Sequence, residues 1–136
     1  MPAYDNLVEV VLENSSRSFT DATSRMLAYV NGLSRANISE MLIDIGAIPQ
    51  SIKPSSSEEK LYSKVTDIVL SRCFKELGLE SEVLESRGNS ADVQATSTHH
   101  GYSLVADSKA MRLSRTAKNQ KDVKVGALGD NWVGDS

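Results

Sequence analysis

Residues 56–78 read SSEEKLYSKVTDIVLSRCFKELG, and this stretch has the clearest helical pattern in the chain. Ser56 and Glu59 have the three-residue spacing of a capping box, a pair of contacts that begins many helices. Gly78 can supply the left-handed residue that ends a helix. Between them, apolar residues recur at helical spacing: Leu61, Val65, Ile68, Val69, Cys73 and Leu77. The pattern predicts one long amphipathic helix.

Three shorter helical patterns precede this helix. In residues 4–14, and again in residues 19–33, apolar side chains recur along one helical face. A third helix is expected to begin at Asn37, because Glu40 follows it at capping-box spacing, and to stop at Gly46 in a left-handed conformation. The first part of the chain is therefore expected to be helical.

Residues 47–54 are expected to interrupt the helices. The residue before a proline favours an extended backbone, and two such pairs occur here, at positions 48–49 and 53–54. We take this connector as a boundary between a helical region over residues 1–53 and a second region over residues 54–136.

After the long helix, the pattern changes to one typical of strands. Residues 102–107 are rich in strand formers, and residues 92–97 alternate imperfectly between apolar and polar side chains. His99-His100-Gly101 lies between them and is turn-like. The sequence predicts a β-hairpin, and the expected fold class is α+β.

The composition limits the class of protein. A chain of 136 residues is expected to form one domain. No apolar run approaches the roughly 20 residues that span a bilayer, and the start lacks the pattern of a secretory signal. The single cysteine, Cys73, excludes an internal disulfide framework and a cysteine-rich zinc site. We expect a soluble cytoplasmic protein that does not bind membranes.

Charge is distributed unevenly along the chain. The net charge is −3, yet residues 109–124 contain six basic residues against one acid, a net charge of +5 that leaves −8 for the other residues. Such a basic segment on an acidic body suggests a polyanionic partner, although a charge run alone more often marks a solvated face. A solvated basic face is the alternative interpretation, and the charges alone leave it open.

Two acids and a lysine accompany the two predicted strands. Asp92 starts the first strand, and Asp107 and Lys109 end the second. Residues two positions apart on a strand point to the same side, so Ser108 would turn away and leave its carbonyl near the site. Carboxylate and carbonyl oxygens suit Mg²⁺, which keeps waters for hydrolysis. A surface salt bridge between these residues remains the alternative interpretation.

Four stretches of the chain resemble the HindIII type II restriction endonuclease family. They are Lys53-Pro54-Ser55-Ser56, Leu84-Glu85-Ser86-Arg87-Gly88-Asn89, Leu104-Val105-Ala106-Asp107-Ser108-Lys109 and Arg112-Leu113-Ser114-Arg115-Thr116-Ala117-Lys118-Asn119-Gln120-Lys121-Asp122. The resemblance implies a partial PD-(D/E)xK nuclease core after the helical region: a helix, the β-hairpin and a basic helix or loop. The likeness ends at Leu128, so we expect a C-terminally truncated member.

By matching position, the resemblance implies that Asp92 and Asp107 are the two catalytic acids and that Lys109 is the catalytic lysine. It implies cleavage of double-stranded DNA with Mg²⁺ as cofactor. The other expected metal ligands are the Ser108 backbone carbonyl and, less directly matched, Glu59 and Glu85.

With this resemblance, the basic segment is expected to contact DNA. The expected DNA-binding residues are Arg112, Ser114, Arg115, Lys118, Asn119, Gln120, Lys121 and Lys124. Arginine and lysine can neutralise phosphates, while asparagine and glutamine suit adenine and lysine suits guanine.

The resemblance implies the palindromic site AAGCTT. A palindrome in turn implies a homodimer, and residues 1–53 are the candidate dimer surface. The resemblance also implies a cognate DNA methyltransferase as a genetic partner. The alternative functions are an inactive DNA-binding remnant and a purely structural helical protein.

Overall fold

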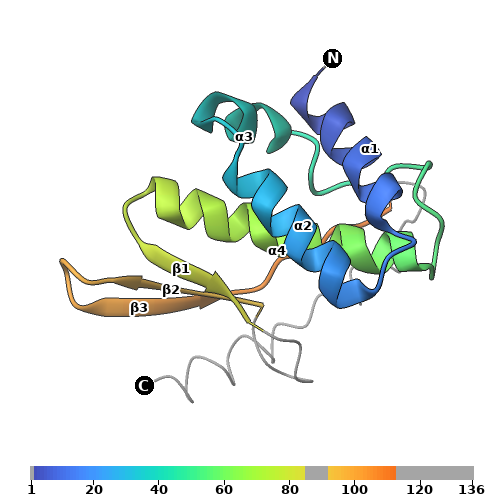
Figure 1. The fold of residues 1–136 in the computed structure, drawn as a ribbon. Coiled ribbons are helices and arrows are strands. Elements are labelled where there is room, and N and C mark those ends of the chain that lie inside the picture. The colour runs from blue at the N-terminus through green and yellow to red at the C-terminus, as the bar shows by residue number, and fades with distance from the viewer. Residues whose placement is uncertain (1, 85–91, 113–136) are drawn as a thin grey trace.

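The computed structural model describes residues 2–84 and 92–112. The helices are α1 (Ala3–Asn14), α2 (Phe19–Asn31), α3 (Arg35–Met41) and α4 (Ser57–Glu76). The strands are β1 (Glu80–Val83), β2 (Val93–Ser97) and β3 (Tyr102–Ala106). Figure 1 shows α4 in the middle, with α1 and α3 on one side and the sheet on the other, while α2 crosses α4. The expected α+β class is confirmed.

The long helix predicted from residues 56–78 is confirmed as α4. The Ser56 hydroxyl accepts a hydrogen bond from the Glu59 amide at 3.3 Å. The Glu59 carboxylate accepts one from the Ser55 amide, so the return contact of the capping box falls one residue earlier than expected. Gly78 follows the helix with φ +90°, as the left-handed stop requires. Leu77, at the end of the predicted apolar face, is 73% exposed.

Replacing the α4 cap tests this start directly. We expect Ser56→Ala to lower the free energy of unfolding by about 1 kcal/mol, because the Glu59 amide loses its acceptor. Urea unfolding followed by circular dichroism measures the change. Ser57→Ala alters an exposed serine one position later and is the matched control. Equal stability of the two variants would show that the cap contributes nothing.

The two helices expected in residues 4–14 and 19–33 are confirmed as α1 and α2, but the third helix differs from its prediction. Its cap is Ser34, whose hydroxyl accepts a hydrogen bond from the Asn37 amide at 3.1 Å. Asn37 was wrongly chosen because both residue types cap helices well. The helix ends at Met41, and among the described glycines only Gly78 and Gly101 have positive φ, so the expected left-handed stop at Gly46 is wrong as well.

Arg72, on α4, forms hydrogen bonds with the end of α2. Its guanidinium donates to the carbonyl oxygens of Val30 and Leu33, each at 2.8 Å. Carbonyl groups in the last turn of a helix have no partner within the helix, and a cation is favoured near them. The Glu76 carboxylate holds the same guanidinium at 2.7 Å. These contacts fix the crossing of α2 over α4, which forms one side of the site described below.

The sheet has the strand order β1-β2-β3 and is antiparallel throughout. The predicted hairpin is confirmed as β2 and β3, and Gly101 takes φ +71° in its turn. β1 was not predicted, because its glutamates are poor strand formers. It pairs along β2, with Glu80 opposite Thr96 and Val83 opposite Val93.

The connector from Ala47 to Pro54 is not helical, as expected. A parallel bridge joins Ala47 to Met111: the Ile48 amide donates to the Met111 carbonyl, and the Met111 amide donates to the Gly46 carbonyl, each at 2.9 Å. We call this pairing the connector bridge. The buried core contains residues from both sides of position 53, and the division there stays a prediction.

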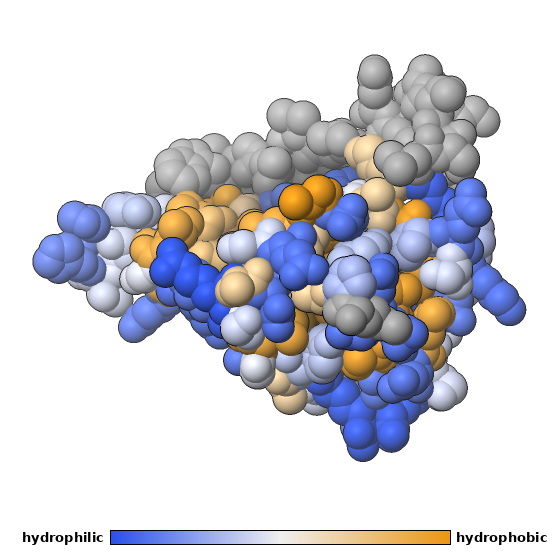
Figure 2. Space-filling view, turned by 90° about the horizontal axis from the view of Figure 1, so that it is seen from above, coloured by the Kyte–Doolittle hydropathy of each residue, from blue (hydrophilic) through white to orange (hydrophobic). Residues whose placement is uncertain are grey.

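Hydrophobic side chains reach the surface in separate areas, each bordered by hydrophilic ones, on the face that Figure 2 shows from above. Ile43, which follows α3, is 85% exposed, and Leu42 beside it is 47% exposed. In the two described ranges, no helix combines the length and the apolar character needed to cross a membrane.

Candidate functional site

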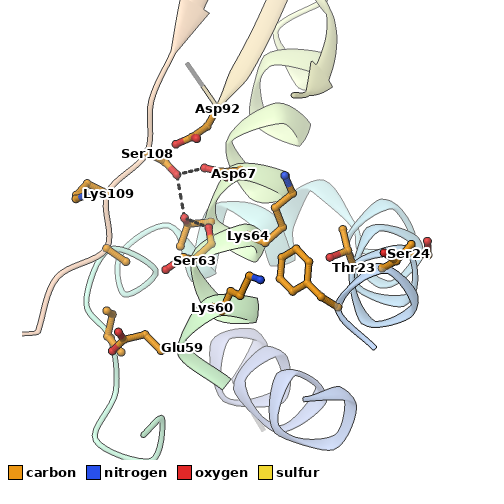
Figure 3. Close-up of a pocket in the computed structure, with 15 residues that line it drawn as sticks. Thr23, Ser24, Glu59, Lys60, Ser63, Lys64, Asp67, Asp92, Ser108 and Lys109 are labelled. Atoms are coloured by element: carbon orange, nitrogen blue, oxygen red, sulfur yellow. Dashed lines mark hydrogen bonds between the residues drawn. The ribbon is translucent and has the colours of Figure 1, made fainter. Parts of the chain in front are cut away.

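A groove of about 700 Å³ lies between the start of α2 and the first half of α4. Asp92 and residues 108–110, which come from both sides of the hairpin, line it as well. Figure 3 shows the side chains of Asp67, Asp92 and Ser108 gathered in one place, with α2 on the far side of α4. The groove therefore combines a helix face with the ends of two strands.

Two carboxylates meet in this groove. Asp67 lies on α4 and is only 7% exposed, and Figure 3 shows its side chain near that of Asp92. Asp92 comes directly before β2, and its amide donates to the Ala106 carbonyl at 3.1 Å, which holds it on the hairpin. Two carboxylates close together repel each other, so the place between them favours a positive charge.

Burial raises the pKa of Asp67 above its usual value, because the charged form loses water. The hydrogen bond that Ser108 donates, the positive charge of Lys64 and the neighbouring Asp92 side chain act in the opposite direction on this pKa. The negative charge of Asp107 raises it further. A divalent cation between the two carboxylates would relieve their mutual repulsion, and oxygen ligands of this kind fit Mg²⁺.

Ser108 connects the strand end to α4. Its hydroxyl donates to the Asp67 carboxylate and lies 2.9 Å from the Thr66 hydroxyl. The expectation was that Ser108 would turn away and offer its backbone carbonyl. The structure instead directs its hydroxyl into the groove, because partners on α4 satisfy it there.

Asp107 and Lys109 flank Ser108 and are both exposed. Lys109 lines the groove, but Figure 3 shows its amine directed away from Asp67. Asp107 does not line the groove, although its charge acts on Asp67. Across residues 2–84 and 92–112, no three acidic, histidine or cysteine side chains are grouped closely enough to hold a metal. The structure thus brings Asp92 to Asp67, and the expected meeting of Asp92 with Asp107 stays a prediction.

Glu59 and Arg112, expected to act on metal and on DNA, contact each other. Two guanidinium nitrogens of Arg112 donate to one Glu59 oxygen at 3.0 and 2.8 Å. Arg112 also donates to the Ile52 carbonyl at 2.6 Å, and its side chain is only 13% exposed. Through these contacts, Glu59 and Arg112 link α4 and the connector to the segment that follows β3.

The remaining predicted site residues lie outside the described ranges. They are Glu85, Ser114, Arg115, Lys118, Asn119, Gln120, Lys121 and Lys124.

Asp67 is not among the site residues expected from the sequence. It stands among the buried residues Val65, Thr66, Ile68 and Val69 of α4. An acid inside such a run is rarely buried without a partner, and that contrast is the signal that could have identified it.

The family described as HindIII restriction endonuclease matches residues 5–135. A curated relative, the type II restriction enzyme HindIII of Haemophilus influenzae, is 46% identical over 128 residues. The alignment covers 94% of this chain and 43% of that relative, so the chain spans less than half the length of the relative.

Proposed function

The chain belongs to the HindIII restriction endonuclease family, and on that premise we propose that it is a type II site-specific deoxyribonuclease. It would hydrolyse phosphodiester bonds of double-stranded DNA with Mg²⁺, at the palindrome AAGCTT. The observation that carries the proposal is the gathering of Asp67, Asp92 and Ser108 in one groove that Lys109 also lines.

The proposed architecture is a partial PD-(D/E)xK nuclease core. Its support is the packing of α4 against β1 and β2, together with the β2–β3 hairpin, whose open end carries both Asp92 and residues 107–109. We also propose that the core begins after the connector, at residue 54.

Asp67, Asp92 and Asp107 are the residues proposed to hold Mg²⁺, with the Ser108 carbonyl, Glu59 and Glu85 as further candidates. When bound, Mg²⁺ supplies a water of lowered pKa and neutralises charge on the phosphate. Lys109 would donate hydrogen bonds to the phosphate oxygens that gain charge during the displacement.

This arrangement requires a change in residues 107–109. Asp107 and Lys109 are exposed, so both would turn toward the carboxylate pair when DNA enters. Catalytic contacts often tighten only in the substrate complex. The Ser108 hydroxyl would be the pivot of this change, since it is tied to Asp67 and Thr66.

Base recognition is assigned to the basic segment after Arg112, with Asn119 and Gln120 reading adenine and Lys121 reading guanine. Arg115 and Lys118 would neutralise phosphates, with Ser114 and Lys124 assisting. Two copies are needed to cut both strands of a palindrome symmetrically, and the helical region 1–53, where Leu42 and Ile43 are exposed, is the proposed dimer surface. A cognate methyltransferase is the proposed genetic partner.

A cleavage assay tests this function. We expect the purified chain with Mg²⁺ to cut a plasmid carrying AAGCTT into discrete fragments and to leave a plasmid without that site intact. Addition of EDTA should stop cleavage, because the carboxylate pair then has no metal to hold. Cleavage of both plasmids at random positions would contradict the proposed site specificity.

The alternative is a chain that binds DNA without cutting it, favoured by the exposed position of Asp107 and by the Lys109 amine, which Figure 3 shows directed away from Asp67. Retention of DNA without cleavage at any Mg²⁺ concentration would support this alternative. Loss of both DNA binding and cleavage, in a chain that unfolds cooperatively, would overturn both functions.

A further inference from the structure

A stripe of side chains on α4 extends from the carboxylate pair along the groove. Lys60, Lys64 and Asp67 are spaced by four and three residues, so they lie on the same face of the helix. All three line the groove. Figure 3 shows both lysines between the carboxylate pair and α2. Positive charge therefore continues directly from the proposed hydrolysis site.

Contacts within the chain hold both ammonium groups in place. The Lys60 nitrogen lies 4.4 Å from the centre of the Phe19 ring, and Lys64 donates to the Leu84 carbonyl at 3.1 Å. An ammonium group has three donors, so the carbonyl leaves donors of Lys64 available. In the part of the chain that the structure describes, no carboxylate forms a salt bridge with either lysine.

We propose that Lys60 and Lys64 form a phosphate-binding stripe for the DNA backbone, next to the hydrolysis site and separate from the basic segment 109–124. This inference rests on the proposed function, because the same DNA strand would occupy both the carboxylate pair and the stripe. Ser63 lies between the two lysines, is exposed and lines the groove, so its hydroxyl adds a neutral donor. Contacts of this kind position DNA without reading its sequence.

Salt dependence of DNA binding distinguishes phosphate contacts from structural roles. Each phosphate neutralised contributes about one unit to the slope of the logarithm of affinity against the logarithm of salt concentration. We would measure the anisotropy of a labelled duplex in EDTA, between about 50 and 200 mM salt. EDTA prevents cleavage during the measurement. One duplex would contain AAGCTT and a second would have the same composition in scrambled order.

The test variant is Lys60→Gln with Lys64→Gln. The control is Lys53→Gln with Lys75→Gln, which removes the same charge from two exposed lysines, one in the connector and one in the last turn of α4. We expect the test variant to reduce the slope by about two relative to this control, equally on both duplexes. Lys60→Arg with Lys64→Arg should keep the wild-type slope.

If removal of Lys64 unfolds the chain, the single Lys60→Gln change at an exposed position should still reduce the slope by about one. A slope equal to that of the control would overturn the stripe while leaving the proposed nuclease function intact. A wild-type chain that binds neither duplex would overturn both.

Discussion

Asp67→Asn is expected to weaken binding of Mn²⁺, used as a probe for Mg²⁺, by at least about 10- to 100-fold, the range seen when even indirect partners at metal sites are changed. The amide keeps the shape of the side chain and can still accept from Ser108, but it removes one negative ligand. We expect cleavage of AAGCTT to fall at least as much. Calorimetric titration measures binding, and the plasmid assay measures the rate.

Glu13→Gln is the matched control for this change. Glu13 is an exposed acid on α1, so its loss alters net charge equally but leaves the groove as it is. The metal titration has a readout even if this chain does not cut DNA. Metal affinity of Asp67→Asn equal to that of the control would remove Asp67 from the site and leave Asp92 without its helix partner.

Met26→Ala is expected to lower the free energy of unfolding by about 2–5 kcal/mol, the range for removal of a large buried side chain. Met26 is fully buried on α2 within the core that α2 shares with α4. The neighbouring structure cannot close the resulting cavity completely, so packing contacts are lost as well as buried apolar area. Urea denaturation measures the loss.

Leu27→Ala provides the comparison, because Leu27 is the next residue and is 41% exposed. We expect this variant to lose less than about 1 kcal/mol, since a surface side chain leaves no closed cavity. Similar losses for the two variants would mean that α2 is not packed on α4 as described. A large loss for Met26→Ala alone confirms that the groove wall is held by burial.

Features that depend on neighbouring residues were predictable from the sequence. The Ser56 cap, the stop at Gly78 and the turn at Gly101 each follow from chemistry within a few positions. The error at α3 was also local: Ser34 and Asn37 both had suitable side chains, and only the backbone geometry decides between them. β1 has no strong signal of its own, since pairing with β2 outweighs the poor strand preference of its glutamates.

The site was less predictable because its contacts join distant parts of the chain. Asp67 and Ser108 are 41 positions apart, and Glu59 and Arg112 are 53 apart. The spacing of Asp107 and Lys109 predicted a shared side, and the structure leaves both exposed while Ser108 is half-buried. The spacing alone could not predict whether Ser108 or its two neighbours would face α4. That orientation depends on the hydrogen-bond partners of the Ser108 hydroxyl, Asp67 and Thr66.

The connector bridge has a consequence for the order in which the molecule forms. Helix α4 and the hairpin can assemble from neighbouring residues, whereas the connector meets Met111 only after almost the whole described chain has left the ribosome. Before the connector bridge forms, its two hydrogen bonds to Met111 do not yet hold the segment that contains Ser108 and Lys109. A nascent chain would therefore form its helices before the groove is complete.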